Sequence, residues 1–163
     1  MIQLQQISIV PVSTENDLAP IRHLFRAYVD WLGIDLSYQG FEEELAGLPG
    51  KYAPPSGALF LAKDEEGSVL GCVGLRAFGK DGACEMKRVY VLPDGRGKGV
   101  GGALVEAVIA AAVAAGYREM LLDTLPSMTG AIKLYEAAGF EQVGAYYDTP
   151  ILETVFFRKQ LNG

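Results

Sequence analysis

The chain has 163 residues, half of them hydrophobic, and a formal net charge of −6 at pH 7. This length and composition exclude a disordered chain, and we expect a single domain with a substantial core over residues 1–163. The acidic balance argues against nucleic acid as a partner, because phosphate binding needs a basic face, and it mildly favours a cationic acceptor such as an amine.

The distribution of apolar and metal-binding residues indicates a soluble, cytoplasmic protein without a metal. No basic and apolar leader opens the sequence, and the long apolar stretches are interrupted by glycines or charges, so we expect no membrane partner. Cys72 and Cys84 lie in apolar runs and are expected to be buried free thiols. The single histidine, His23, lies off the apolar stripe of its helix, and the chain lacks the ligand pattern of a zinc site.

The first half of the chain predicts a strand, two helices and a hairpin, in that order. Apolar residues recur at helical spacing from Leu18 to Leu32, behind a capping-box pattern that runs from Thr14 to Asp17, and Gly33 ends this helix. The expected elements are a strand over 5–12, helices over 18–32 and 41–46, and hairpin strands over 58–63 and 68–77.

The second half predicts one β-α-β unit, followed by a further helix and two strands. The helix of this unit has one charged residue, Glu106, so we expect it to be buried on almost all sides. In the strand before it, alternation places residues 85, 87, 89 and 91 on one face and residues 86, 88, 90 and 92 on the other, unless a bulge intervenes. The expected elements are strand 84–92, helix 100–115, strand 117–123, a helix from 126–127 to 139, and strands 142–146 and 153–161.

A glycine-rich loop, Arg96-Gly97-Lys98-Gly99-Val100-Gly101-Gly102, joins that strand to the buried helix. Glycine permits a positive φ and close approach of another group to the backbone, so successive N–H groups can face one concavity. The following helix adds the unpaired N–H groups of its first turn and the positive end of its dipole. The loop therefore predicts a cradle for a phosphate or pyrophosphate.

Two other phosphate-binding loops fit this stretch less well. A nucleotide-triphosphate loop requires Ser or Thr after its lysine, but Lys98 is followed by Gly99. The dinucleotide fingerprint G-x-G-x-x-G fits Gly97, Gly99 and Gly102, with Asp123 about 20 residues later. However, segment 93–96 separates the strand from the first glycine, and the tail after Asp123 is too short for the rest of a dinucleotide fold. A dehydrogenase is therefore a weaker hypothesis than the two that the rest of the sequence supports.

Three segments together resemble the GCN5-related N-acetyltransferase (GNAT) superfamily. Arg96-x-x-Gly99-x-Gly101 resembles its R/Q-x-x-G-x-G/A signature, Val89-Tyr90-Val91-Leu92-Pro93 the preceding strand, and AIKLYEAAGF, residues 131–140, the later A-x-x-L-Y-E-x-x-G-F helix. The resemblance covers about 57–161 well. It implies an α/β (α+β) fold with a mixed, mostly antiparallel sheet of about six to seven strands, about four flanking helices and a β-α-β unit around the cofactor loop.

The resemblance also implies acetyl-CoA as the co-substrate. Backbone N–H groups from Arg96 to Gly102 would hold its pyrophosphate, with a smaller contribution from the charges of Arg96 and Lys98. In the family, N–H groups of the preceding strand, here Val89–Val91, contact the pantetheine and the oxyanion. This role requires strand 84–92 to separate from strand 117–123. The variable segment 33–57 commonly lines the acceptor pocket in such proteins.

Two side chains are candidates for proton transfer. Tyr135 aligns with the family tyrosine that protonates the leaving thiolate, which a phenol of pKa about 10 can do, although its helical spacing also fits a core tyrosine. Glu85 stands where some relatives place the carboxylate that deprotonates the amine; the alternative is a surface glutamate paired with Lys87 or Arg88. Asp123 or water could replace Glu85 as the base, and Asp123 could instead cap the following helix.

Met128 stands where many members of the superfamily carry asparagine, which removes an amide near the cofactor and Tyr135. The leading hypothesis is an acetyl-CoA-dependent N-acetyltransferase in which a primary amine of a small molecule, or a peptide N-terminus, attacks directly. The alternative is an acyl-CoA-binding regulatory module without turnover, which the methionine slightly favours. Exposed strand edges near the C-terminus favour a homodimer.

Overall fold

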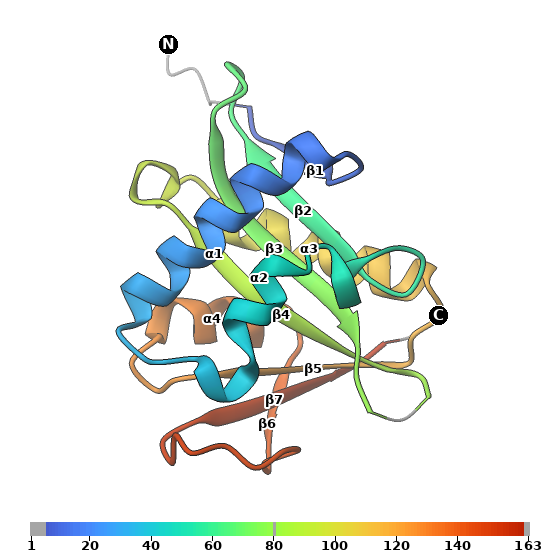
Figure 1. The fold of residues 1–163 in the computed structure, drawn as a ribbon. Coiled ribbons are helices and arrows are strands. Elements are labelled where there is room, and N and C mark those ends of the chain that lie inside the picture. The colour runs from blue at the N-terminus through green and yellow to red at the C-terminus, as the bar shows by residue number, and fades with distance from the viewer. Residues whose placement is uncertain (1–5, 80, 162–163) are drawn as a thin grey trace.

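The computed structural model describes residues 6–79 and 81–161, and a seven-stranded sheet forms its centre (Figure 1). The strand order across the sheet is β1-β2-β3-β4-β5-β7-β6. All neighbouring strands are antiparallel except β4 and β5, which are parallel. The strands are β1 (Ser8–Pro11), β2 (Ala58–Lys63), β3 (Val69–Ala77), β4 (Ala83–Val91), β5 (Glu119–Thr124), β6 (Glu141–Val143) and β7 (Val155–Gln160). The predicted mixed, mostly antiparallel sheet is therefore confirmed.

In the described ranges, four α-helices cover the two faces of the sheet, with α1 and α2 on one face and α3 and α4 on the other (Figure 1). The helices are α1 (Leu18–Leu32), α2 (Phe41–Ala46), α3 (Val100–Ala114) and α4 (Thr129–Ala137). Each face has its own core, which includes the fully buried Ile21 and Phe25 on the α1 side and Leu104 and Val108 on the α3 side. None of these helices is both long and apolar enough to cross a membrane.

The start of α1 differs from the predicted capping box. The Thr14 side chain makes no hydrogen bond to the helix backbone, and a turn of 3-10 helix over Glu15–Asp17 leads into α1 instead. The end of α1 is as predicted, because Gly33 adopts a φ of 68° and donates its N–H to the carbonyl of Val29. Part of the predicted first strand, at Gln5, lies outside the described residues.

The loop between β6 and β7 bends back toward the sheet. β6 ends at Val143 rather than at Tyr146, because Tyr146 and Tyr147 leave the strand and donate their hydroxyls to Glu85 of β4 and Asp123 of β5. The other element boundaries lie within a few residues of the predicted ranges. This loop therefore closes over the side of the sheet that carries α1.

A β-bulge interrupts β4 at Arg88. The register against β3 shifts between Cys72 and Gly74, and Arg88 adopts a φ of 61°, a conformation that is uncommon outside glycine. The buried Cys72 thiol donates a hydrogen bond to the Arg88 carbonyl oxygen, with an Sγ–O distance of 3.3 Å. Both cysteines are buried and free, as predicted.

The bulge makes the predicted alternation of β4 wrong beyond Lys87. Lys87 and Arg88 are consecutive in the chain, yet both donate hydrogen bonds to Gln39, on the α1 side of the sheet. The α1 side of β4 carries Glu85, Lys87, Arg88 and Tyr90, whereas Cys84, Met86, Val89 and Val91 pack on the α3 side. Two cationic side chains in succession therefore point to the same side.

β4 and β5 separate soon after they pair. Their parallel ladder covers only Ala83–Glu85 and Glu119–Leu121, after which β4 continues to Val91 while β5 continues in register with β7. The β4 edge that faces β5 is unpaired in this ladder beyond Glu85. The separation expected from the resemblance is present, and the ends of the two strands border an opening in the sheet.

We expect Gly71→Ala to destabilise the fold. Gly71 pairs with Val91 across β3 and β4, and a Cβ atom at Gly71 would lie 2.6 Å from the backbone oxygen of Tyr90. Because that oxygen belongs to the backbone, the strands would have to shift, which lowers the free energy of unfolding by about 1–3 kcal/mol. Denaturant unfolding measures this change. Gly144→Ala is the control, since its Cβ would meet no atom within 4 Å, and equal stability of the two variants would contradict the close packing.

Candidate active site

A groove of about 370 Å³ runs along the end of β4, past the glycine loop and onto α4. The predicted cofactor residues that line it are Val89, Tyr90, Val91, Arg96, Gly97, Gly99, Val100, Gly101 and Gly102. Lys98 is exposed and is not among the lining residues. The structure therefore brings the end of β4 and the backbone of the loop together at one groove.

The conformation of the glycine loop leaves room for an anion. Gly97 and Gly99 have φ values of 78° and 79°, and a Cβ atom at either would meet no atom within 4 Å. These glycines therefore serve the backbone conformation and the open space beside it. α3 begins at Val100, and no side chain caps its N-terminus. The N–H groups of this first turn are available to a ligand, which fits a pyrophosphate.

Arg96 is held against aromatic rings at one wall of the groove. Its Nε donates to the Val91 carbonyl over 3.1 Å, and its guanidinium carbon lies 5.3 Å from the ring centroid of Trp31 and 5.9 Å from that of Tyr90. Trp31, on α1, is 48% exposed and also lines the groove. The sequence analysis missed this residue, whose signal is a tryptophan off the buried stripe of an amphipathic helix.

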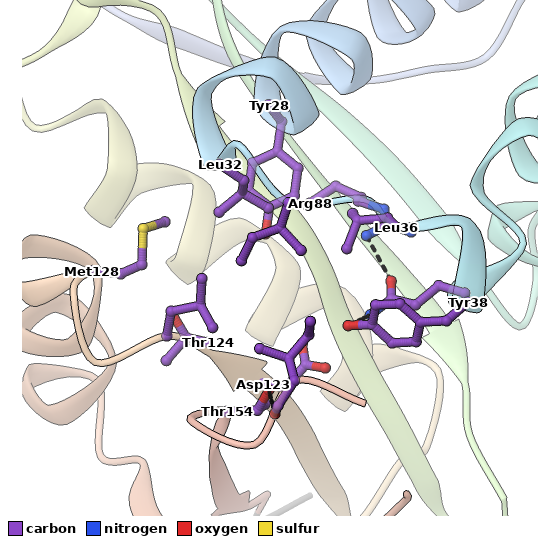
Figure 2. A pocket seen from close by; sticks show the side chains of 13 residues that line it. Tyr28, Leu32, Leu36, Tyr38, Arg88, Asp123, Thr124, Met128 and Thr154 are labelled. Atoms are coloured by element: carbon purple, nitrogen blue, oxygen red, sulfur yellow. Dashed lines mark hydrogen bonds between the residues drawn. The ribbon is translucent and has the colours of Figure 1, made fainter. Parts of the chain in front are cut away.

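A smaller cavity of about 40 Å³ lies between α1 and the ends of β4 and β5. Figure 2 shows Tyr28 of α1 on one side of this cavity and Asp123 and Thr124 of β5 on the other. Met128 lines both this cavity and the groove, so the two spaces lie next to each other. Segment 33–57, expected at the acceptor pocket, contributes Ile34, Leu36, Tyr38 and Gln39 to the cavity wall.

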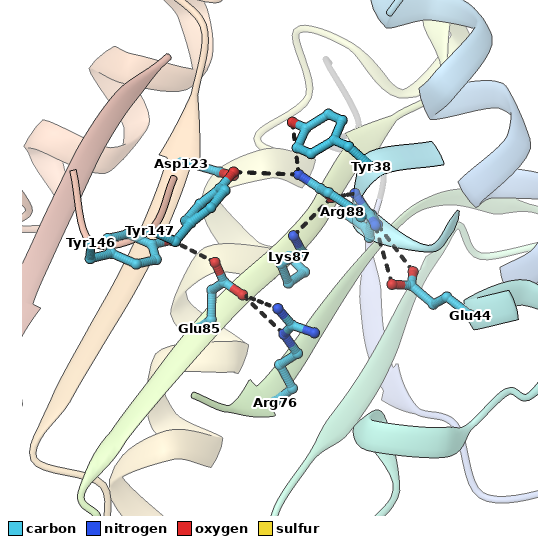
Figure 3. A network of polar contacts seen from close by, with 10 residues as sticks. Tyr38, Glu44, Arg76, Glu85, Lys87, Arg88, Asp123, Tyr146 and Tyr147 are labelled. Carbon is cyan, nitrogen blue, oxygen red and sulfur yellow. Dashed lines mark hydrogen bonds and ion pairs between the residues drawn. The ribbon is translucent and has the colours of Figure 1, made fainter. Parts of the chain in front are cut away.

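A polar cavity of about 200 Å³ lies beside the first, and a hydrogen-bond network surrounds it (Figure 3). Arg88 binds Glu44 through two hydrogen bonds of 3.1 Å and donates a third, of 2.9 Å, to Gln39. Gln39 also accepts from Lys87 and donates to the hydroxyl of Tyr38. Burial opposes the charge of Arg88, but its hydrogen bonds and ion pair with Glu44 raise its pKa above the ordinary value.

Glu85 is buried rather than placed at the surface. Only 1% of it is exposed, and it pairs with Arg76 over 2.8 Å, not with Lys87 or Arg88, so the predicted surface pair is wrong. Its other oxygen accepts the hydroxyl of Tyr146 over 2.5 Å. Burial and the negative charge of Glu85 raise the pKa of Tyr146 far above 10, so the phenol stays a donor.

Asp123, at the end of β5, accepts a hydrogen bond from the hydroxyl of Tyr147. Burial and this bond raise the pKa of Tyr147 well above its ordinary value. α4 begins at Thr129, directly after Met128, so Asp123 does not cap it. Two tyrosines, Tyr146 and Tyr147, were not among the predicted site residues, and their one signal in the sequence is an aromatic pair where a predicted strand meets a turn.

Tyr135 lies on α4 with its ring in the core. It is 6% exposed and packs against Phe140 and Phe157, with ring centroids 6.0 and 6.4 Å apart. Burial raises its pKa above 10, and the nearby Tyr28 and Asp123 raise it further, so the hydroxyl stays protonated. Both of these neighbours line the small cavity. Tyr135 therefore packs in the core, as its helical spacing predicts, and also lies near residues that line the small cavity.

The fold is shared with solved acetyltransferase structures. A GNAT-family acetyltransferase from Staphylococcus aureus aligns with a TM-score of 0.79 at 18% identity, over 96% of this chain and 100% of that chain. A Salmonella typhimurium structure that contains acetyl-CoA as its cofactor aligns with a TM-score of 0.68 at 22% identity, over 96% of this chain and 94% of that chain.

Sequence comparison identifies the family. The chain is 40% identical over 162 residues to an uncharacterized N-acetyltransferase of Schizosaccharomyces pombe, with 99% of both chains covered. It is 31% identical over 144 residues to human N-acetylaspartate synthetase, a match that covers 84% of this chain and 45% of that protein. Residues 18–140 match the model of the acetyltransferase (GNAT) family. With the groove, the glycine loop and the separated strands already in place, these matches show that the chain belongs to the GNAT family of acetyltransferases.

Proposed function

We propose that this acetyltransferase acts in the cytoplasm and transfers the acetyl group of acetyl-CoA to a primary amine of a small molecule, or to a peptide N-terminus, by direct attack. The observation that carries the proposal is the groove where the glycine loop, the start of α3 and the unpaired edge of β4 meet. Acetyl-CoA supplies the acyl group as an activated thioester. The chain must then bind it, deprotonate the amine, stabilise the oxyanion and protonate the thiolate.

The backbone performs the binding in this proposal. N–H groups from Arg96 to Gly102 hold the pyrophosphate, supported by the positive φ of Gly97 and Gly99 and by the uncapped start of α3. N–H groups of Val89–Val91 hold the pantetheine and the oxyanion, supported by the separation of β4 from β5. Arg96, fixed between Val91 and Trp31, adds a positive charge at the wall.

Asp123 suits the role of general base better than Glu85 does. Both oxygens of Glu85 are already engaged, one by Arg76 and the other by Tyr146. Asp123 is half-buried and lines the cavity that adjoins the groove, where an amine would approach the thioester. We therefore assign the base to Asp123 and assign Glu85 to the support of the site through Arg76 and Tyr146.

Tyr135 is the proposed general acid. Its raised pKa keeps the phenol protonated, so the hydroxyl can donate a hydrogen bond, and then its proton, to the sulfur as negative charge develops there. Its ring is fixed by Phe140 and Phe157, which limits how far the hydroxyl can move.

A thiol-release assay with acetyl-CoA and a panel of amines tests the proposed function. The panel includes amino acids, aspartate among them, together with polyamines, aminoglycosides and peptide N-termini. A transferase releases CoA in proportion to the acetylated amine. An acyl-CoA-binding module without turnover would saturate with acetyl-CoA and release no CoA above the background.

We expect Gly99→Val to weaken acetyl-CoA binding far more than Lys98→Ala. Valine is strained at the φ of 79° found at Gly99, and its side chain would enter the open space beside the loop. Lys98 is exposed, so its loss costs about 1 kcal/mol or less. Isothermal titration measures both affinities, with melting temperatures as the control for folding. Equal losses would contradict a backbone cradle.

Tyr135→Phe removes one hydroxyl and keeps the ring that packs in the core. If Tyr135 is the general acid, kcat falls by about 10²-fold or more, while acetyl-CoA affinity and melting temperature hardly change. The kcat values are measured by steady-state kinetics under conditions in which the chemical step is rate-limiting. An unchanged kcat under those conditions would assign Tyr135 to the core alone and leave water as the proton source.

Asp123→Asn and Glu85→Gln separate catalysis from support. Asp123→Asn retains shape but removes the base, so kcat falls by about 10²-fold with little change in stability. Glu85→Gln leaves Arg76 without a countercharge and lowers the free energy of unfolding by about 1–3 kcal/mol. Steady-state kinetics and denaturant unfolding are measured for both variants. If Glu85→Gln loses more kcat than Asp123→Asn at equal stability, Glu85 and not Asp123 is the general base.

A further inference from the structure

Lys87 is a buried lysine whose ammonium forms no ion pair with a carboxylate of the described residues. Only 6% of the residue is exposed, and its ammonium donates one hydrogen bond, of 3.1 Å, to the neutral side-chain oxygen of Gln39. Across residues 6–79 and 81–161, no carboxylate forms an ion pair with it. An ammonium can donate three hydrogen bonds, and a buried charge is costly unless it is paired. Lys87 therefore has unused capacity for an anion.

Three carboxylates near Lys87 are engaged by other partners, whereas Asp148, an exposed residue of the same cavity, forms no ion pair with Lys87. Glu85 is bound by Arg76 and Tyr146, Glu44 by Arg88, and Asp123 by Tyr147. Burial lowers the pKa of Lys87, and the charges of Arg88 and Arg76 act in the same direction, while those of Glu85 and Asp123 offset this only in part. An anion that enters the cavity could therefore pair with the Lys87 ammonium, which no described carboxylate does.

The open space beside Lys87 can hold such an anion. Lys87 lines the polar cavity of about 200 Å³, several times the roughly 30 Å³ of one water molecule (Figure 3). The bulge places Arg88 on the same side of β4 as Lys87, so both cations line this cavity, but Arg88 is paired with Glu44. A strained backbone beside a cavity is typical of functional sites.

We propose that Lys87 binds a carboxylate of the acceptor, so that the acceptor is a small amine that also carries a carboxylate, such as an amino acid. This inference rests on the proposed transferase function and names its substrate class. The polar cavity shares Tyr38, Gln39 and Arg88 with the cavity lined by Asp123. One molecule can thus place its carboxylate at Lys87 and its amine toward Asp123 and the groove.

A binding experiment tests the carboxylate site without turnover. N-acetylglycine and N-methylacetamide share the acetamide group, but only the former has a carboxylate. We expect N-acetylglycine to raise the melting temperature of the wild-type protein and N-methylacetamide to have little effect. Equal effects of the two compounds would overturn the proposal, and this comparison needs no variant.

Lys87→Met replaces the ammonium with an apolar side chain of similar length. Without ligand, we expect a higher melting temperature than that of the wild type, because an unpaired buried charge is removed. The shift caused by N-acetylglycine should disappear in this variant but persist in Lys51→Met, which removes an exposed lysine outside the three cavities. A lower melting temperature together with an undiminished N-acetylglycine shift would make Lys87 a structural residue.

The turnover arm compares matched acceptors with and without a carboxylate. The pairs are glycine with methylamine, β-alanine with ethylamine and 4-aminobutyrate with propylamine, and L-aspartate and L-glutamate are added. For the best acceptor pair, kcat/KM should favour the carboxylate by about tenfold or more, and Lys87→Met should reduce that ratio by a similar factor. A preference for the amine without a carboxylate would overturn the proposal. If carboxylates bind through Lys87 but no amine is acetylated, the result would contradict the transferase function and still support the carboxylate site.

Discussion

The short parallel ladder between β4 and β5 is the constraint on which the rest of the site depends. Three residues on each strand pair, and this junction joins the antiparallel strands β1 to β4 with the group formed by β5, β7 and β6. Beyond Glu85 the edge of β4 that faces β5 has no partner in this ladder, and the groove and the two smaller cavities lie around the resulting opening.

The features that the sequence could predict depend on short-range patterns. The helical stripe of α1, its end at Gly33 and the glycine loop before α3 all follow from the conformational preferences of neighbouring residues. These patterns also occur in the expected order for a β-α-β unit, while the mostly antiparallel sheet and the part played by the end of β4 were implied by the resemblance to the GNAT superfamily. The residues that line the groove from β4 and the loop were therefore available without a structure.

The acceptor side could not be predicted in the same way, since it is built from contacts between distant segments. Nothing in the sequence marks Arg88 as a residue with positive φ, and this one backbone conformation reversed the predicted faces of β4 beyond Lys87. Likewise, Glu85 finds its partners nine residues earlier in Arg76 and 61 residues later in Tyr146. The net charge of −6 describes the whole chain and gave no sign of a buried, unpaired lysine.

The two adjacent tyrosines of the β6–β7 loop link β4 and β5 where these strands separate. Tyr146 donates a hydrogen bond to Glu85 of β4 and Tyr147 donates one to Asp123 of β5. Their rings are tilted against each other and make edge-to-face contacts with Phe156. The loop that carries them contributes none of the residues that line the groove at the glycine loop. Changes in this loop can therefore alter the width and chemistry of the two smaller cavities while the groove at the glycine loop stays intact, so under the proposed function the choice of acceptor can vary separately from cofactor binding.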